Sequence, residues 1–164
     1  GRVMQVLAGV SIMGLLTLYF SDVLDRQRNP NREVSSAVSE EGVREVVLRR
    51  NRMGHYVTAG TINGQDVEFL LDTGATGVAI PAHLAEELAL PRGRAMATNT
   101  ANGVARSYQT RLAEVAIGDI RLNNVDASIS PGLRMNEILL GMSFLKYVEF
   151  TQRGNTLTLR QYPG

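Results

Sequence analysis

The sequence predicts a mainly β fold, a small barrel-like domain with one short helix, preceded by an N-terminal transmembrane helix. Three observations predict it: an uncharged apolar stretch near the N-terminus, short strand-like runs separated by tight-turn dipeptides, and one amphipathic helical segment. The chain has 164 residues, which suits one globular domain plus an appendage. We divide it into a transmembrane signal anchor at residues 1–20, a flexible tether at 21–42 and a folded domain at 43–164.

Composition excludes several classes of function. The net charge of +1 argues against nucleic acid as a partner, and the absence of cysteine excludes a disulfide scaffold, a thiol nucleophile and a cysteine metal site. With two histidines and no dense cluster of histidine and carboxylate residues, we expect no metal site and no cofactor. No Gly-x-Ser-x-Gly motif offers a serine nucleophile.

The anchor is the apolar stretch at residues 3–20. Its 18 residues carry no charge, and as a helix they would span about 27 Å, close to the hydrocarbon thickness of a bilayer. A cleaved signal peptide is the competing interpretation, but the following residues lack an Ala-x-Ala cleavage pattern. A buried core helix is a third interpretation, which is disfavoured because the segment is apolar on all sides.

Two opposing arguments bear on the orientation of the span, that is, on which side of the membrane the domain lies. Arg2 precedes the span while Arg26, Arg28 and Arg32 follow it, a distribution that by itself favours a cytoplasmic domain. An N-terminal anchor followed by one compact domain is, however, the usual plan of an exported bacterial protein. We therefore expect a single-pass protein of a bacterial inner membrane with its domain in the periplasm.

Residues 21–42 are polar, poor in aromatics and without a lasting period, which predicts a tether with little fixed structure. From residue 43 onward the signals are mostly β. Asn63-Gly64 and Asn102-Gly103 are strong hairpin dipeptides, and Arg153 to Asn155 form a further turn. The exception is the stretch 81–90, where Pro81 suits a first helical turn and apolar residues recur at helical spacing.

The stretch Val67–Pro81, "VEFLLDTGATGVAIP", carries the chemistry. A largely apolar strand ends at one carboxylate, Asp72, and turns at once through Thr73 and Gly74. Asp, Thr and Gly are ordinary turn residues, so an ordinary turn is the simplest interpretation. A carboxylate at the end of an apolar strand is costly unless it is hydrogen-bonded or paired, and this favours a function for it.

"FLLDTGAT" resembles the active-site segment of the retropepsin-like aspartic proteases (clan AA), the group that includes retroviral proteases. "EILLG", ending at Gly141 and 69 positions after Asp72, resembles the hydrophobic-hydrophobic-Gly element of that family. "TANGVARSYQ" between them looks like the flap hairpin. The resemblance covers residues 43–161, and the helix at 81–90 together with the anchor is more similar to a bacterial membrane-anchored branch than to the shortest viral members.

The resemblance implies a retropepsin-like half-barrel and an aspartic endopeptidase whose substrate is a protein or peptide. Such chemistry uses two carboxylates sharing a proton, one as general base toward a water and one as general acid. Because this chain offers one Asp-Thr-Gly, we expect a homodimer joined through the active-site face, with Asp72 of both chains as the catalytic pair.

The other site residues are also assigned by resemblance. Thr73, Gly74 and Ala75 would form the active-site loop, and Thr73 would brace its symmetry mate. The flap would comprise the four residues Ala101, Asn102, Gly103 and Val104. The later strand that ends in "EILLG" would support the active-site loop through Leu139, Leu140 and Gly141.

Several alternatives stay open. The hairpin at Asn102-Gly103 is a plain connection in the simplest interpretation. The segments "EVVL" and "TLTLR" either pair between chains or form ordinary edge strands. A non-catalytic module that holds an extended peptide by strand addition is the alternative to an enzyme, and a membrane-anchored regulator or scaffold is a third.

Overall fold

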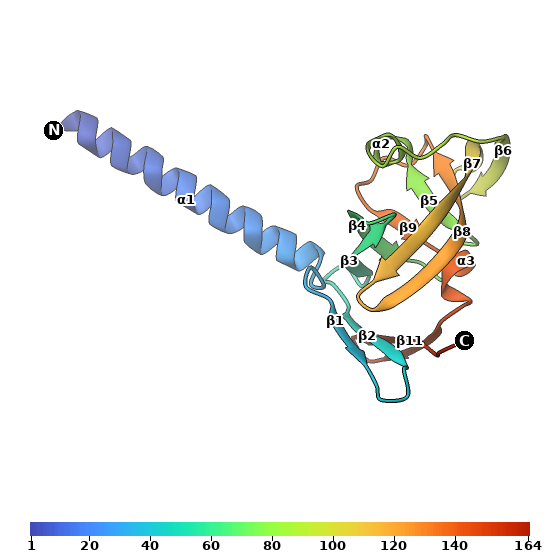
Figure 1. The fold of residues 1–164 in the computed structure, drawn as a ribbon. Helices are drawn as coiled ribbons and strands as arrows, with labels where there is room; N and C mark the ends of the chain where they lie inside the picture. Colours follow the sequence, from blue (N-terminus) through green and yellow to red (C-terminus); the bar gives the residue numbers. More distant parts are fainter.

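Short runs of alternating burial form two β-sheets, to which three helices are added in the computed structural model of residues 1–164 (Figure 1). The helices are α1 (Arg2–Arg28), α2 (Ala82–Glu87) and α3 (Met142–Leu145). The strands are β1 (Ser35–Val38), β2 (Arg44–Arg49), β3 (Tyr56–Ile62), β4 (Gln65–Leu71), β5 (Val78–Pro81), β6 (Ala95–Thr100), β7 (Gly103–Ile117), β8 (Ile120–Ser130), β9 (Ile138–Leu140), β10 (Glu149–Arg153) and β11 (Thr156–Gln161).

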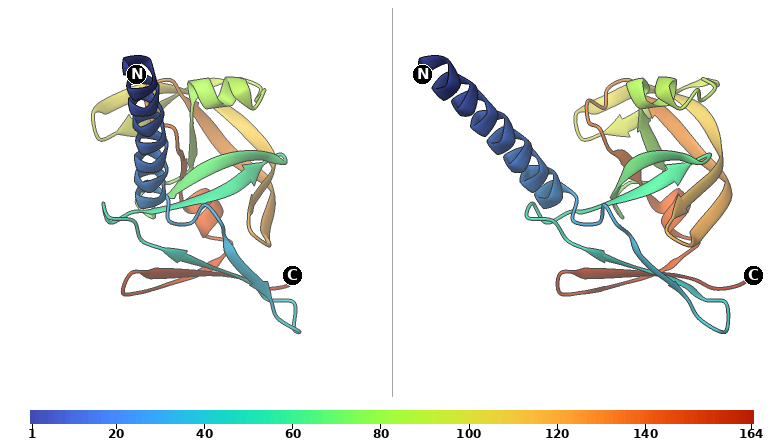
Figure 2. Two further views of the ribbon diagram at one scale, coloured as in Figure 1. Left: turned by 90° about the vertical axis from the view of Figure 1, so that its left-hand side faces the viewer. Right: turned by 60° about the vertical axis from the view of Figure 1, so that its left-hand side comes forward.

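Helix α1 is longer than the predicted span, since it continues without a break to Arg28. None of its residues is buried, and Figure 1 and the right view of Figure 2 show it projecting away from the β domain. It is therefore not a core helix of this domain. By length and composition it could cross a membrane, although a signal sequence near the N-terminus meets the same criteria of length and composition.

The structure differs from the flexible tether expected at residues 21–42. The first part of that segment is the end of α1, and Ser35–Val38 form β1, which pairs with β2. Between them Asn29 and Asn31 are buried against the domain. The polar composition suggested disorder, but the Asn31 side chain bonds backbone groups of β2 and β3 and the Asn29 side chain donates to Glu68 of β4, which orders the segment.

The four-stranded sheet has the order β1-β2-β11-β10, with every neighbouring pair antiparallel. Strands β2 and β11, which correspond to "EVVL" and "TLTLR", pair with each other, and Leu48 lies opposite Leu157. Both strands have neighbours on both sides, so neither is an edge strand and neither is free to pair with a second chain. The edges of this sheet are β1 and β10.

The seven-stranded sheet has the order β3-β4-β9-β5-β8-β7-β6. A further pairing of β3 with β7, at Thr61 with Ala116, curls it into a half-barrel. Hairpins close at Asn63-Gly64, where both residues have positive φ, and at Gly118. The order places β9, the last strand in sequence of this sheet, between β4 and β5.

The core lies inside this half-barrel and extends to the four-stranded sheet. It consists of 22 buried residues, of which Phe69, Ile80, Leu112, Ile138, Leu140 and Phe144 are among the largest fully buried side chains. Leu48 and Leu159 join the same cluster from the smaller sheet. The two sheets therefore share one core, as expected for a retropepsin-like half-barrel.

Candidate active site

Asp72 lies directly after β4, where the apolar strand leaves the core. Its side chain is half-buried, and the N–H of Gly74 donates to its Oδ1 at 2.9 Å. The N–H of Ala75 donates to the backbone carbonyl of Asp72 at 3.2 Å and closes the turn. The carboxylate makes no other hydrogen bond within the chain, so its second oxygen is free to accept a water or a proton from another molecule.

Strand β9 passes beside this turn and holds it. β9 runs parallel to β4 and antiparallel to β5, and the N–H of Asp72 donates to the carbonyl of Leu140 at 3.1 Å. At Gly141 a Cβ would collide with the backbone carbonyl oxygens of Gly77 and Ala75, the latter at 2.6 Å. Glycine is therefore required at this position for the two segments to approach.

Leu139, Leu140 and Gly141, the predicted supporting residues, thus lie beside the Asp72 loop in the structure. Leu140 is fully buried and Leu139 is half-buried, so these two anchor the strand while Gly141 provides the close approach.

Ser143 is a positioning residue that sequence reasoning missed. Its hydroxyl accepts from the N–H of Val78 at 3.1 Å and donates to the carbonyl of Asp126 at 3.3 Å. Its own N–H donates to the carbonyl of Thr76 at 3.0 Å. Ser143 therefore fixes the exit of the loop into β5, and its place two residues after Gly141 is the only sequence signal that could have indicated it.

The side chain at the tip of the loop has no hydrogen-bond partner inside the chain. Thr73 and Gly74 are exposed, and the side chain of Thr73 makes no hydrogen bond. Of the other aspartates of the sheet, Asp126 pairs with Arg111 at 2.9 Å and Asp119 accepts from Ser36 at 2.6 Å. Asp66 is exposed near the start of β4, six residues before Asp72, and makes no hydrogen bond with it. No second carboxylate of the same chain is therefore arranged with Asp72.

The predicted flap is the hairpin between β6 and β7. Thr100 lies opposite Gly103, and the turn residues Ala101 and Asn102 are exposed. Gly103 has a φ of 106°, which only glycine adopts easily. Val104 is 73% exposed, so an apolar side chain stands in solvent at the hairpin tip. An exposed hairpin of this kind can move and can cover a ligand.

The structure contains no group of three or more His, Cys, Asp or Glu residues that could hold a metal ion. An open groove of about 700 Å³ lies away from Asp72, between the end of α1, the β3–β4 hairpin and α2. Most of its lining residues are polar, and Arg28 and Glu68 are among them.

Comparison with known proteins identifies the family and supports the fold. The sequence profile of the family described as gag-polyprotein putative aspartyl protease matches residues 58–147, more than half of the chain. A retropepsin-like aspartic protease from Rickettsia conorii has a similar structure, with a TM-score of 0.60 and 25% sequence identity over 79% of this chain and 95% of that protein.

Two curated relatives have no described function. The first, an uncharacterized protein encoded in the cobV 5′ region of a Sinorhizobium species, is 37% identical over 73% of this chain and 53% of its own length. The second, protein RP867 of Rickettsia prowazekii, is 29% identical over 63% of this chain and 46% of its own length. The chain thus spans about half the length of the curated relatives that it matches. With the profile covering both the Asp72 loop and β9, this chain belongs to the gag-polyprotein aspartyl protease family and has a retropepsin-like fold.

Proposed function

We propose that the protein is an aspartic endopeptidase, active as a homodimer in which each chain contributes Asp72. One observation carries the proposal: a half-buried carboxylate sits at the end of an apolar strand, held by Gly74 and supported by a β9 whose Gly141 has no room for a side chain. Family membership supports the same conclusion.

The dimer follows from the chemistry and from the exposed loop. Hydrolysis of a peptide bond by this route needs one ionised and one protonated carboxyl group. The ionised Asp72 removes a proton from water as the water oxygen attacks the peptide carbonyl carbon, and the protonated Asp72 donates to the carbonyl oxygen. Collapse of the tetrahedral intermediate breaks the C–N bond as the amine gains a proton. Thr73, exposed and without a partner in its own chain, would brace the second loop.

Substrate would lie between the Asp72 pair and the flap hairpin at 101–104. β6 forms one edge of its sheet, and its outer backbone groups can pair with an extended peptide. Val104 at the hairpin tip would exclude water when the hairpin closes.

The test compares Asp72→Asn with Asp66→Asn in the full chain, purified in detergent and assayed on a mixed peptide library at about pH 4 to 7. Asp66 is a matched control, because it is an exposed aspartate on the strand that leads to Asp72. We expect activity in the wild type and in Asp66→Asn and none in Asp72→Asn. Asp72→Asn that cleaves as fast as wild type removes Asp72 from the mechanism.

The shared site has its own test. Co-expressing equal amounts of wild-type and Asp72→Asn chains forms mixed dimers, and random pairing leaves about one quarter of the dimers with two intact aspartates. Specific activity per total chain should fall to that fraction. A fall to one half indicates sites that work within single chains. A protein that binds the peptides without cutting them would instead be the non-catalytic peptide-binding module.

We further propose that residues 3–20 anchor the protein in a membrane with the domain in the periplasm. The exposed apolar surface of α1 supports the anchor. A protease applied to intact spheroplasts should degrade the domain, and protection until lysis would place it in the cytoplasm.

A further inference from the structure

The end of α1 and the segment that follows it are bonded to each other, and both are then attached to the domain by several contacts. Past Phe20, α1 continues for eight residues to Arg28 as uninterrupted helix, about 12 Å long. Arg26 and Arg32 both donate to Asp22, at 2.8 and 3.0 Å, which ties the segment after the helix back to its last turns. The N–H of Asn29 donates to the carbonyl of Asp25 at 2.9 Å and extends the helical bonding by one residue.

Asn31 joins this segment to both sheets. Its Nδ2 donates to the carbonyls of Arg49 at 2.9 Å and Val57 at 2.7 Å, and its Oδ1 accepts from the N–H of Arg49 at 2.7 Å. Its backbone carbonyl accepts from the N–H of Ala59 at 3.0 Å. Arg49 ends β2 of the small sheet while Val57 and Ala59 belong to β3 of the large one. Asn31 is 4% exposed, so these bonds are shielded from water.

A second buried asparagine caps the helix. Asn51 donates to the carbonyl of Arg28 at 2.9 Å, while its Oδ1 accepts from the N–H groups of Met53 and His55 at 3.0 and 2.9 Å. The last carbonyl of α1 is therefore hydrogen-bonded to the domain.

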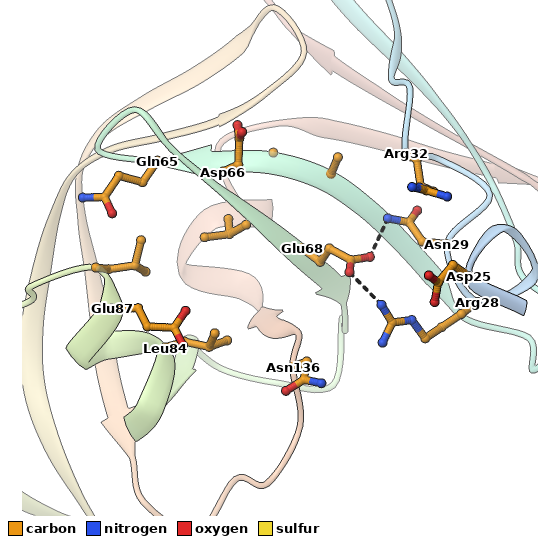
Figure 3. Close-up of a pocket in the computed structure, with 14 residues that line it drawn as sticks. Asp25, Arg28, Asn29, Arg32, Gln65, Asp66, Glu68, Leu84, Glu87 and Asn136 are labelled. Carbon is orange, nitrogen blue, oxygen red and sulfur yellow. Dashed lines mark hydrogen bonds and ion pairs between the residues drawn. The ribbon is translucent and has the colours of Figure 1, made fainter. Parts of the chain in front are cut away.

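Arg28 connects the helix end to the two strands of the candidate active site. Its guanidinium pairs with Glu68 of β4 at 2.8 Å, and with Glu137, the residue before β9, at 3.5 Å. Asn29 donates to the other oxygen of Glu68 at 2.7 Å, and Figure 3 shows both bonds converging on Glu68 from the end of α1. Glu68 lies four residues before Asp72. The helix is thus attached to the strands that carry Asp72 and Gly141.

From this attachment we infer the substrate class: segments of other membrane-anchored proteins, cut close to the same face of the bilayer. The inference rests on the proposed protease activity and membrane anchor. A flexible tether of residues 21–42 would have reached an average of about 25 Å and about 70 Å when extended. The observed link instead leaves about 12 Å of helix below a domain roughly 37 Å across, so the active site stays within roughly 50 Å of the bilayer.

The experiment uses the full chain in liposomes together with single-span test substrates. Each substrate carries the same cleavable peptide, placed either beside its own span or beyond a helical spacer that lifts it about 75 Å away. A soluble peptide of that sequence reports activity independent of the membrane. We expect wild type to cut the near site at least about tenfold faster than the far site, because only the near site is held within reach.

Two insertions between Ser21 and Asp22 serve as matched variants, since they leave every contact between residues 22–32, the docked segment, and the domain in place. Twenty Gly/Ser residues should reduce the near-to-far ratio to within about threefold by giving the domain a flexible reach. Twenty residues of helix-forming repeats should instead move the preferred cut site outward by about 30 Å. Both variants should cut the soluble peptide as fast as wild type.

Equal cutting of near and far sites by wild type overturns the inference, and so does a ratio that neither insertion changes. A wild type that cuts the soluble peptide but neither anchored substrate also overturns it, while the protease function stands. Failure to cut any peptide, soluble or anchored, overturns the protease function itself.

Discussion

Replacing Gly141 with alanine tests whether the contact between β9 and the Asp72 loop is as tight as the structure indicates. The added methyl would overlap the carbonyl oxygens of Gly77 and Ala75, with the latter at 2.6 Å and the Ala75 carbonyl carbon at 2.9 Å. These are backbone atoms, so no rotamer change relieves the overlap. The loop must move, and the bond from the N–H of Met142 to the carbonyl of Ala75, 2.9 Å long, is stretched with it.

Overpacking of this kind costs about 1–3 kcal/mol, and one weakened hydrogen bond adds about 1 kcal/mol. We therefore expect the free energy of unfolding to fall by about 3 kcal/mol, equivalent to a decrease of about 6–12 °C in Tm for a chain of this size. Peptidase activity should fall by more than the folded fraction alone explains, because Asp72 moves with the loop.

The assay is thermal unfolding of the detergent-solubilised full chain by circular dichroism, with Gly132→Ala as the control. Gly132 lies in the loop before β9 and does not have positive φ, and no atom lies within 4 Å of the position that an added methyl would take. The Tm of this control should therefore stay within about 2 °C of wild type. A Gly141→Ala protein as stable and active as Gly132→Ala refutes the close approach.

Three further changes follow from the same contacts. Asn31→Ala removes three side-chain hydrogen bonds and should lower the free energy of unfolding by about 3 kcal/mol, measured by urea denaturation, whereas the exposed Asn102→Ala should change it by less than about 0.5 kcal/mol. Ser143→Ala should cost about 1–2 kcal/mol and reduce kcat, and Ser143→Thr, which keeps the hydroxyl, should recover part of both; equal loss in the two variants would argue against the hydroxyl. Tyr162 donates to Glu149, and this hydrogen bond raises the pKa of the phenol. The contact therefore stabilises the fold fully at pH values below the ordinary tyrosine pKa, and its contribution is lost as the pH rises through the raised pKa of the folded state. Glu149→Gln should lower that pKa in an NMR titration of labelled tyrosine, and an unchanged value would remove the cause assigned here.

Local signals were sufficient for the parts of the fold made by neighbours in sequence. Asn63-Gly64 closes the β3–β4 hairpin because both residues tolerate positive φ. Pro81 precedes α2, which ends at Glu87, three residues earlier than the predicted segment. Asp72 follows β4 as the apolar run required. The placement of β9 between β4 and β5 came only through the resemblance, since no local pattern specifies a parallel neighbour that lies far along the chain.

The order of the docked segment, residues 22–32, could not be predicted because it depends on contacts with residues far along the chain. Asn31 reads locally as a turn or linker residue, and its partners Arg49 and Val57 are 18 and 26 positions away. Its order depends on burial against two sheets that meet only after folding. Ser143 is similar, because its place two residues after Gly141 indicates a role only once β5 and β8 are placed beside it.

Pairing inside the chain also bears on how a dimer would form. β2 and β11 are flanked on both sides by strands of their own chain, so they cannot pair with a second copy. The surfaces that remain for a dimer contact are the face with the Asp72 loop and the free edges β1, β6 and β10. An interface made mainly by two short loops buries less than the roughly 1,000 Å² of a stable assembly. We expect dimers in detergent to be weak, and dimers in a bilayer to be favoured because anchoring raises the effective concentration.

This weakness has a measurable consequence. Specific activity in detergent should fall steeply as the protein is diluted from micromolar to nanomolar concentration, because monomers carry only one Asp72. In liposomes at a fixed protein-to-lipid ratio, diluting the suspension leaves the surface density unchanged, so specific activity should stay constant. Activity in detergent that is constant down to nanomolar protein would show that the dimer does not depend on the anchor, and analytical ultracentrifugation at the same concentrations would then distinguish a tight dimer from an active monomer. The first result would assign more of the interface to the strand edges, whereas the second would contradict a site shared between two Asp72 residues.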